Sequence, residues 1–517
     1  MKRSRVIVIG AGAGGLAAAV RLSAQGLDVL VLERAAEPGG KLRALAVAGR
    51  PVDAGPTVCT MRWVLDELFD AAGQRAGDVL TLTPARVLAR HAWGPGECLD
   101  LHADQRDTVD AISRFAGPRE AAAYQAFCAQ AAAIYRALEV PFLRGQRPSL
   151  PGLLWRAGLS GLPGLARISP FQTLWRGLVR HFQDPRLRQL FGRYATYCGS
   201  SPYLAPATLM LVAHVEREGV WRIEGGMHRL AAALAELARR CGARLRCAAD
   251  VARISTAQGR VDGVVLRSGE HLAADAVVFN GDVAALSGGL LGAPAQRGLA
   301  GDARRWQQPQ QRTQSALTWC AVARCSGFAL QHHNVFFSPD YAAEFDDVMR
   351  DGRLPADPTV YVCAQDRDAA EGAAPDGPER LLCLVNAPAR DDLRPLTLQE
   401  IDACEQRAFQ RLAECGLQWQ TVAPMRRTTP SDFAAMFPAS AGALYGPASH
   451  GWRASFRRQG SRHRLPGLYL AGGSTHPGPG VPMALLSGQR AAERLLADLA
   501  STHSWHPMPM PGGTSMR

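Results

Sequence analysis

The first thirty residues alternate between short apolar runs and small residues in an order that predicts a strand, a helix and a second strand. Residues 6–9 form a β-branched apolar run, and residues 28–32 form another. Runs of this kind are typical of parallel strands that are buried on both faces. Between them, residues 16–25 predict an alanine-rich helix, and Gly26 is placed to end it. The pattern therefore predicts a βαβ unit at the start of an α/β fold.

The same pattern returns in two later parts of the chain. Residues 230–240 predict a helix, and strands are expected after it at residues 243–247, 251–256, 261–267 and 275–279. Far downstream, residues 469–471 predict a short buried strand and residues 483–499 predict a helix. One α/β unit is therefore expected to be assembled from three separated pieces of the sequence.

A glycine-rich turn follows the first strand directly. Gly10, Gly12 and Gly15 have the spacing G-x-G-x-x-G, Gly14 lies in the same turn, and Glu33 ends the second strand. In this pattern the first glycine permits a tight turn, the second lets the backbone approach a pyrophosphate, and the third lets the helix pack closely on the strand. The helix N-terminus offers free N–H groups to phosphates, and the acid accepts ribose hydroxyls but repels a 2′-phosphate. The unit predicts a dinucleotide other than NADP and leaves the choice between FAD and NAD open.

A second glycine pair decides between these two dinucleotides. The pair is Gly39-Gly40, Lys41 follows it directly, and the segment Gly55-Pro56-Thr57 comes shortly after. This arrangement resembles the flavin amine oxidase and phytoene desaturase superfamily, in which FAD lies extended across the domain. The resemblance implies that these residues contact FAD, and that backbone near the position of Val251 contacts its adenine side.

A glycine- and proline-rich loop lies between the last predicted strand and the last predicted helix. The candidate flavin contacts in this loop are Gly472, Gly473, Gly480, Val481, Pro482 and Met483. The helix directs its N-terminus at the loop and stabilises negative charge there. The loop resembles the C-terminal flavin motif of bacterial-type carotenoid desaturases, in which Thr-His-Pro-Gly precedes the last helix. Two roles are open for His476, a catalytic acid or base and a packing or hydrogen-bonding role, and we favour the second.

Residues 2–498 as a whole resemble the bacterial-type phytoene desaturase family of carotenoid oxidoreductases. Within this family, residues 52–69 and 482–488 are most similar to the 1-hydroxycarotenoid 3,4-desaturases, also called methoxyneurosporene dehydrogenases, and Met61-Arg62-Trp63 carries the subtype signal. The resemblance implies an FAD-dependent enzyme that introduces a C3–C4 double bond into 1-hydroxy acyclic carotenoids such as 1-hydroxyneurosporene. The substrate is then a lipophilic polyene, aligned with the flavin in a dry tunnel.

The resemblance also implies a domain organisation. The fold class is α/β, with a Rossmann-like FAD-binding domain of the flavin amine oxidase type and an inserted α+β substrate domain. We expect the FAD-binding domain at residues 1–90, 220–290 and 450–500, and the substrate domain at residues 91–219 and 291–449. Residues 501–517 match nothing in the family, and we expect them to be a disordered tail.

Charge narrows the choice of partners. The chain of 517 residues has a net charge of +12, but it lacks dense blocks of Lys and Arg, so we expect no nucleic acid partner. Residues 140–183 contain no Asp or Glu, and they carry six arginines among Trp and Leu. This composition suits the interface of an anionic membrane. We expect peripheral attachment on the cytoplasmic side, because no stretch of about 20 apolar residues is present to span the bilayer. The alternative is an ordinary helical region whose arginines are solvated.

The sequence predicts neither a catalytic base nor a metal site. It shows no paired carboxylates and no Ser/His/Asp set, and its twelve cysteines lack Cys-x-x-Cys spacing. After hydride transfer to a flavin, positive charge spreads over the polyene and makes the neighbouring proton acidic, so a strong base is not required. Three other functions stay open: a phytoene or neurosporene desaturase, a flavin oxidase of amines or porphyrinogens, and a non-enzymatic lipid escort. The electron acceptor, either oxygen or a quinone, the oligomeric state and the residue that contacts the C1 hydroxyl are not predicted.

Overall fold

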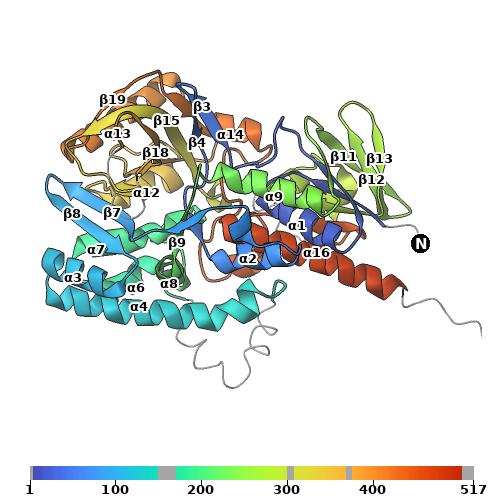
Figure 1. Ribbon diagram of the computed structural model, residues 1–517, viewed down its shortest axis with the longest axis horizontal. Helices are drawn as coiled ribbons and strands as arrows, with labels where there is room; N and C mark the ends of the chain where they lie inside the picture. Colours follow the sequence, from blue (N-terminus) through green and yellow to red (C-terminus); the bar gives the residue numbers. More distant parts are fainter. Residues whose placement is uncertain (1–3, 149–170, 300–307, 368–374, 504–517) are drawn as a thin grey trace, which may run out of the picture.

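The computed structural model describes residues 4–148, 171–299, 308–367 and 375–503. Its smaller sheet has five parallel strands in the order β10-β2-β1-β14-β21. The strands are β1 (Arg5–Ile9), β2 (Asp28–Leu32), β10 (Arg244–Arg246), β14 (Ala276–Phe279) and β21 (Leu468–Leu470). The predicted α/β fold is confirmed, and strands from three separated parts of the chain lie side by side in this sheet (Figure 1).

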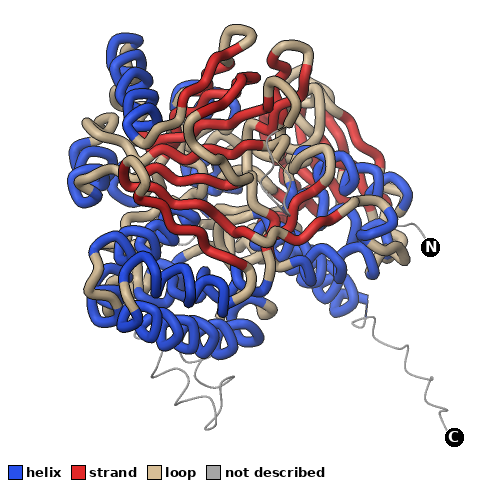
Figure 2. The backbone as a smooth tube through the Cα atoms, turned by 60° about the vertical axis from the view of Figure 1, so that its left-hand side comes forward, coloured by secondary structure: helices blue, strands red, loops and turns tan. Residues whose placement is uncertain are grey.

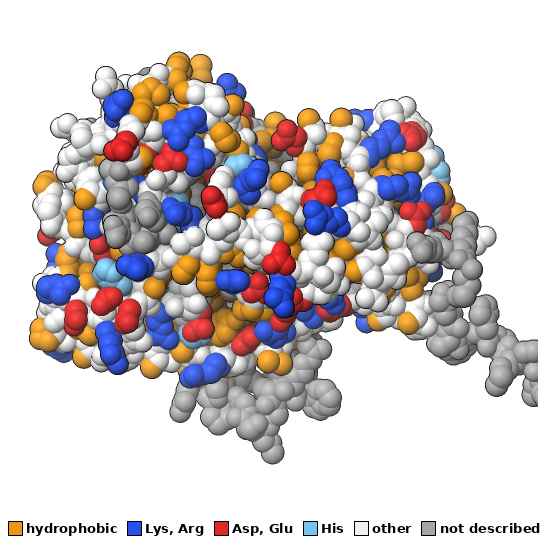
Figure 3. Space-filling model, viewed as in Figure 1, with side chains coloured by type: hydrophobic (Ala, Val, Ile, Leu, Met, Phe, Trp, Pro, Cys, Tyr) orange, Lys and Arg blue, Asp and Glu red, His pale blue; other side chains and the backbone are white. Residues whose placement is uncertain are grey.

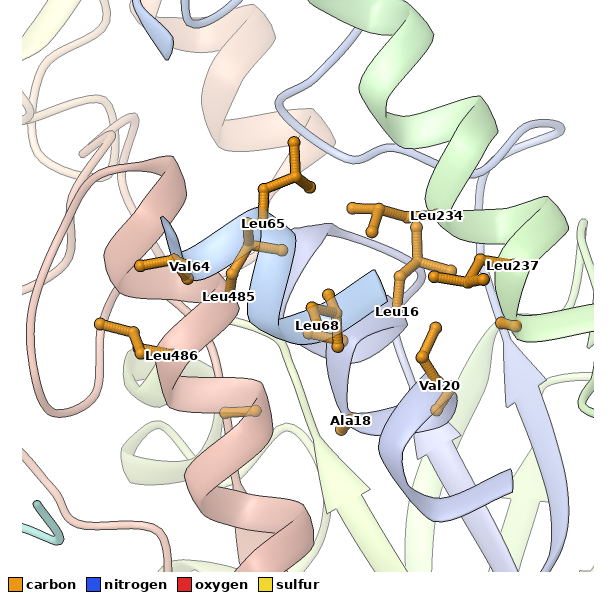
Figure 4. Close-up of a cluster of buried hydrophobic side chains, with 14 of the residues drawn as sticks. Leu16, Ala18, Val20, Val64, Leu65, Leu68, Leu234, Leu237, Leu485 and Leu486 are labelled. Atoms are coloured by element: carbon orange, nitrogen blue, oxygen red, sulfur yellow. The ribbon is translucent and has the colours of Figure 1, made fainter. Parts of the chain in front are cut away.

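One face of the smaller sheet is covered by helices. They are α1 (Ala13–Ala24), α9 (His228–Arg240) and α16 (Val481–His503), with α2 (Arg62–Asp70) packed beside them. Figure 4 shows Leu16 and Val20 of α1 beside Leu234 and Leu237 of α9, at the centre of this layer. Full burial of a leucine stabilises the fold by about 1.5–3 kcal/mol. These leucines therefore fix the position of α1, whose N-terminus begins at the glycine-rich turn.

Helices α1 and α16 cross in direct backbone contact. A Cβ atom at Gly488 would lie 2.0 Å from the carbonyl oxygen of Gly14, and a Cβ atom at Gly14 would lie 2.9 Å from the carbonyl oxygen of Ala484. Real Cβ atoms do not approach a backbone atom this closely, so both positions require glycine. The crossing places the first turn of α16 beside the first turn of α1.

The ends of these helices differ from the predicted ends. Helix α1 begins three residues before the predicted start at residue 16. Residues 13–15 are alanine and glycine, which do not show the helical pattern of apolar positions on which the prediction depends. Helix α16 begins two residues before residue 483, since proline is tolerated in a first helical turn. It continues to His503, so the first residues of the expected tail at 501–517 are helical and that boundary was wrong. Residues 504–517 lie outside the described part.

The larger sheet has eight strands and is mostly antiparallel. Its order is β19-β15-β18-β17-β16-β7-β8, with β20 also paired to β15, and only β16 and β7 are parallel. The strands are β7 (Val87–Gly94), β8 (Glu97–His102), β15 (Ser315–Ser326), β16 (His333–Phe336), β17 (Val360–Ala364), β18 (Glu379–Ala387), β19 (Gln418–Thr421) and β20 (Arg426–Thr428). Figure 2 shows this sheet above a layer of helices. They are α3 (Gln105–Ala116), α4 (Pro118–Leu138), α6 (Leu174–His181), α7 (Pro185–Gly192) and α8 (Leu211–Glu218).

Side chains of the larger sheet alternate between two environments. On β15, Leu317 and Trp319 pack against helix α13 (Leu398–Glu414), while Ala316 and Thr318 face the opposite side. Successive residues of a strand point to opposite faces, so this division is the period of two that a strand requires. The face turned away from α13 is free to form the wall of a cavity.

Three small sheets complete the fold around the two main sheets. They are formed by β3 (Ala44–Val47) and β4 (Arg50–Asp53), by β5 (Cys59–Thr60), β9 (Val220–Ile223) and β6 (Leu82–Pro84), and by β11 (Val251–Ala257), β12 (Arg260–Leu266) and β13 (His271–Ala273). The last of these and the short helix α10 (Val283–Ser287) pack on the face of the smaller sheet opposite α1.

The charged side chains form no single-sign field on the face shown in Figure 3, where Arg and Lys lie among Asp and Glu. Arg144, one of the six arginines expected to face a membrane, is partly buried, with 34% of its side chain exposed. It makes ion pairs with Glu67 at 2.6 Å and Glu139 at 3.0 Å and stacks over the Trp63 ring at 3.7 Å. These contacts do not test the expected attachment to a membrane, which stays a prediction. Arg176 and Arg180 on α6 are exposed.

Residues 149–170, which include the predicted arginines 156 and 167, lie outside the described part. Among the helices that the structure describes, none combines the length and the apolar character needed to cross a membrane.

Candidate functional site

A cavity of about 890 Å³ lies between the two main sheets. It brings together all but one of the candidate site residues. The candidate residues in its wall are Gly10, Gly12, Gly14, Glu33, Gly40, Lys41, Gly55, Pro56, Thr57, Val251, Gly472, Gly473, Gly480, Val481, Pro482 and Met483. Gly15 is the exception, because a Cβ atom there would lie 2.0 Å from the carbonyl oxygen of Gly10. Gly15 thus lets α1 pack on the turn, as the pattern predicts.

The glycine-rich turn is held by backbone hydrogen bonds and by one side chain from the residue that follows β14. Gly10 donates to the carbonyl of Leu32 at 2.7 Å, and Gly39 donates to Ala11 at 2.9 Å. The Asn280 amide donates to the carbonyl of Gly10 at 3.2 Å. Asn280 was missed by the sequence analysis, although a polar residue at the carboxyl end of a parallel strand is a signal for a ligand site. The glycine-rich turn and the Gly39-Gly40 pair are therefore adjacent, and the N-terminus of α1 lies at this turn.

The carboxylate of Glu33 is fixed beside this turn. One oxygen accepts the N–H of Ala11 at 2.7 Å, and the other accepts the N–H of Ala35 at 2.8 Å. An ionised carboxylate has about four acceptor sites, so capacity remains for the two hydroxyls of a ribose. Glu33 lines the cavity, and its contact with a ribose stays a prediction.

Asp53 anchors the loop that carries Gly55-Pro56-Thr57. Its carboxylate accepts the backbone N–H groups of Met227 at 2.6 Å and His228 at 3.1 Å, at the start of α9. It also lies 2.6 Å from Nδ1 of His228 and is only 5% exposed. The neighbouring Gly55 packs against Lys41, since a Cβ atom there would lie 1.8 Å from the carbonyl oxygen of Lys41. The loop is thus fixed from two sides.

Two basic side chains, Lys41 and Arg458, line the cavity. The Lys41 ammonium donates to the carbonyl of Leu444. Arg458 donates to the carbonyls of Gly473 at 3.0 Å and Pro447 at 2.6 Å. Burial lowers the pKa of Arg458 to about 10, so the guanidinium stays protonated at neutral pH. Its carbonyl partners orient the charge without neutralising it, and the sequence analysis did not find this residue.

His476 has a packing role. Its ring is 1% exposed, meets the Phe142 ring at 4.7 Å, and lies outside the wall of the cavity. Its Nε2 atom lies 3.2 Å from the carbonyl oxygen of Gly145, to which it donates. Burial lowers the pKa of His476 to about 4, so the ring is neutral at pH 7. This geometry agrees with the favoured of its two predicted roles.

The far half of the cavity is mainly apolar. One wall is the free face of the larger sheet, and the other is formed by the helices below it. The apolar side chains of these walls include Leu88, Val335, Leu382, Leu384, Leu209, Leu211, Val212 and Val215. A long apolar guest that enters this half loses its contact with water, which favours binding.

One group in the described part has the composition of a metal site, although its charge surroundings are unsuited to a cation. His332, His333 and Cys363 place nitrogen and sulfur atoms within 4.8 Å of one another. Burial and the positive charge of Arg222 lower the pKa of His332 to about 4, and burial raises the pKa of the Cys363 thiol. A metal ion would meet the same arginine field. We therefore treat the group as neutral hydrogen-bonding side chains.

Glu344 makes the stability of the fold depend on pH. Burial raises its pKa from 4.5 to about 7. Above pH 4.5 the unfolded chain releases this proton while the folded chain keeps it, so stability is lost as pH rises to about 7. We expect Glu344→Gln to be more stable than the wild type at pH 8, by up to about 3 kcal/mol, and to lose this advantage at pH 5.

Thermal unfolding at pH 5 and pH 8 measures this effect. Glu97→Gln, on an exposed hairpin, is the matched control and is expected to follow the wild type at both values. Equal unfolding midpoints for the Glu344→Gln variant and the wild type at pH 8 would contradict the interpretation.

Comparison with known proteins identifies the family. The model of flavin containing amine oxidoreductases matches residues 13–496. The chain belongs to that family. It is a flavin oxidoreductase whose cofactor is FAD, and the turn at Gly12, which has room for a closely approaching phosphate, fits this group.

Similar sequences and similar structures agree with this assignment. A hydroxyneurosporene desaturase from Rubrivivax gelatinosus is 54% identical over 100% of this chain and 98% of its own length. One from Cereibacter sphaeroides is 48% identical over 96% of this chain and 98% of its own. The structure of wild-type putrescine oxidase covers 96% of this chain and 99% of its own at 15% identity, with a TM-score of 0.60. Cyclohexylamine oxidase from Brevibacterium oxydans covers 97% and 100% at 18% identity, with a TM-score of 0.56. These structures share the fold.

Proposed function

We propose that this protein is an FAD-dependent desaturase that forms the C3–C4 double bond of 1-hydroxy acyclic carotenoids such as 1-hydroxyneurosporene. The observation that carries the proposal is the continuity of the cavity. One part of the wall holds the residues expected to contact FAD, and the wall beyond them is mainly apolar over both a sheet face and a helix layer. The full-length similarity to hydroxyneurosporene desaturases supports this substrate class.

We assign the candidate residues to parts of FAD. Gly10, Gly12 and Gly14 approach the pyrophosphate, Glu33 accepts the ribose hydroxyls, and Val251 lies at the adenine side. The flavin half is contacted by Gly40, Lys41, Gly55, Pro56, Thr57, Gly472, Gly473, Gly480, Val481, Pro482 and Met483. Bound FAD supplies a ring that accepts a hydride from the substrate. The first turn of α16 and the cation Arg458 then favour negative charge at this end of the cavity.

The two proposed domains correspond to the two main sheets. Residues 1–90, 220–290 and 450–500 form the FAD-binding domain, and residues 91–219 and 291–449 form the substrate domain. In support, the smaller sheet takes its strands from the first set, and all strands of the larger sheet but part of β7 come from the second.

The protein aligns the substrate and excludes water from the polyene; it does not supply a strong base. Apolar side chains exclude water from the polyene, so a cation that forms on the carbon chain is not captured by hydration. The charge spreads over the conjugated system, and the proton beside it is then released readily. Alignment of the reacting carbons with the flavin is therefore the main work of this site.

A liposome assay tests the proposed function. Purified protein with FAD is given 1-hydroxyneurosporene, neurosporene or phytoene, and the absorbance of the carotenoid is followed. Each new conjugated double bond moves the absorbance to longer wavelength. We expect this shift with the hydroxylated substrate. Turnover of phytoene instead would contradict the proposed substrate and leave the family unchanged.

We also propose that the protein attaches to the membrane surface on the cytoplasmic side and takes its substrate from lipid. Phe171 is 80% exposed, lines the cavity and contacts the Trp452 ring at 5.2 Å. Val179 and Val140, within the same arginine-rich segment, are 46% and 68% exposed. Apolar side chains that are exposed beside a cavity mouth are suited to insertion among acyl chains.

The variant Phe171→Glu tests this attachment. We expect its binding to anionic liposomes to fall several-fold, because a charge replaces an inserting ring. Flotation with liposomes measures the effect. Leu398→Glu is the matched control, since Leu398 is 74% exposed at the start of α13, on the far side of the larger sheet. An equal loss in both variants would contradict the assignment of this surface.

A further inference from the structure

Three hydrogen-bonded side chains lie in the wall of the cavity, where the loop that carries Thr57 meets strands β16 and β17 of the larger sheet. The hydroxyl oxygens of Thr57 and Tyr361 lie 2.7 Å apart. The Tyr361 hydroxyl also lies 2.7 Å from Nδ1 of His333. All three residues line the cavity, and the rings of Tyr361 and His333 are stacked at 6.1 Å. Polar groups in an apolar wall lower affinity for a hydrocarbon, so their presence requires an explanation.

The side chains of Thr57, Tyr361 and His333 are all neutral. Burial lowers the pKa of His333 well below its usual value, and the charge of Arg193 acts in the same direction. Burial likewise raises the pKa of Tyr361. A neutral imidazole has one donor and one acceptor nitrogen, and each hydroxyl both donates and accepts. The hydrogen bonds can therefore run in either direction, and the Thr57 hydroxyl at the end of this series is left with capacity for one more partner.

The position of Thr57 links these three side chains to the reacting end of the cavity. Thr57 directly follows Gly55 and Pro56, and Gly55 packs on the backbone of Lys41. Tyr361 and His333 belong to β17 and β16 of the opposite wall. A substrate whose C3 and C4 lie at the flavin has its C1 hydroxyl only two carbons away. With the flavin at Gly55, Pro56 and Thr57 as proposed above, this hydroxyl lies near the Thr57 side chain.

We propose that the Thr57–Tyr361–His333 chain binds the C1 hydroxyl of the substrate and makes the enzyme select hydroxylated over unsubstituted polyenes. This inference rests on the proposed function. A tertiary hydroxyl both donates and accepts one hydrogen bond, which matches a neutral chain that can reverse its direction. An unsubstituted polyene would cover the Thr57 hydroxyl without giving it a partner, and such burial is unfavourable.

A second polar group in the wall is less suited to this role. Arg193 donates to the Tyr197 hydroxyl at 2.8 Å, and that hydroxyl donates to Glu216 at 2.5 Å. The Tyr197 hydroxyl is thus occupied on both sides. The permanent positive charge of Arg193 would also oppose the positive charge that forms on the polyene.

Substrate selectivity in three variants of the hydrogen-bonded side chains and in one control variant tests the proposal. Tyr361→Phe and Thr57→Val each remove one hydroxyl, and Thr57→Ser keeps it. We expect both of the first two variants to lower the preference for 1-hydroxyneurosporene over neurosporene by about 10- to 100-fold, measured as the ratio of the two kcat/KM values per bound FAD. Because Thr57 is also a proposed flavin contact, only Tyr361→Phe is expected to convert or bind neurosporene as well as the wild type does. Thr57→Ser is expected to retain the preference. Tyr203→Phe makes the same chemical change outside the wall, where Tyr203 packs on Trp175, and should retain it too.

The outcomes separate this inference from the proposed function. Equal losses of kcat/KM for both polyenes would show that the three hydrogen-bonded side chains only support the loop. Unchanged selectivity would show that the hydroxyl binds elsewhere. Either result overturns the inference while the desaturase assignment stands. A wild-type enzyme with full flavin content that converts neither polyene overturns the proposed function and the inference with it.

Discussion

Replacement of Gly12 by valine is expected to yield a folded protein that no longer retains FAD. Gly12 has φ −76° and ψ 177°, a conformation that any residue adopts. A Cβ atom there would meet one neighbour, the Asn280 amide nitrogen at 3.1 Å, and would otherwise point into the cavity. The valine methyl groups therefore occupy the place where the pyrophosphate approaches the N-terminus of α1. We expect affinity for FAD to fall by about 100-fold or more, equivalent to roughly 3 kcal/mol.

Flavin content per chain after gel filtration and circular dichroism of the same sample measure this effect. Gly77→Ala is the matched control, because a Cβ atom at Gly77 meets nothing within 4 Å and Gly77 is outside the wall. The control should keep its flavin. A Gly12→Val protein with full flavin content would contradict the assignment of the glycine-rich turn.

Replacement of Asp53 by alanine is expected to lower the unfolding temperature and to release flavin. The change leaves the N–H groups of Met227 and His228 without their acceptor, and it removes the carboxylate from the His228 ring. Removal of one partner from a buried charged pair lowers the free energy of unfolding by about 3–5 kcal/mol. The loop 54–57 loses one of its two supports, so FAD binding should weaken with it.

Thermal unfolding followed by flavin fluorescence and by circular dichroism measures both consequences. Asp53→Asn keeps one acceptor oxygen and should give an intermediate midpoint. Asp346→Asn removes a carboxylate from an exposed ion pair with Arg350, and it should leave the midpoint almost unchanged. A wild-type midpoint for Asp53→Ala would mean that α9 and the loop are held by other contacts.

The N-terminal βαβ unit was predictable because its signals are local. The residues of β2 agree with the predicted range, Gly10 has a positive φ of 96° that favours glycine, and Gly15 is required by its contact with the Gly10 carbonyl in the same unit. The apolar run of β1 likewise predicts burial on both faces without knowledge of any distant residue. Such patterns establish that a strand or turn exists, but they do not establish which strands are neighbours.

The features that were missed depend on contacts between distant parts of the chain. Asn280 lies beside Gly10 only because β14 pairs with β1. Arg458 acquires its position from the carbonyls of the loop at Gly473. Arg144 pairs with Glu67, which lies 77 residues away in the sequence. No local pattern of apolar and polar residues contains this information.

An anaerobic single-turnover experiment tests the central claim most directly. Protein with bound FAD is mixed with excess 1-hydroxyneurosporene in liposomes without any electron acceptor, and the products are separated and identified. We predict one molecule of product per bound FAD, with the new double bond at C3–C4 and the C1 hydroxyl retained, and no product from Gly12→Val. Absence of product from the flavin-loaded wild type, or product whose amount does not depend on flavin content, would contradict the account.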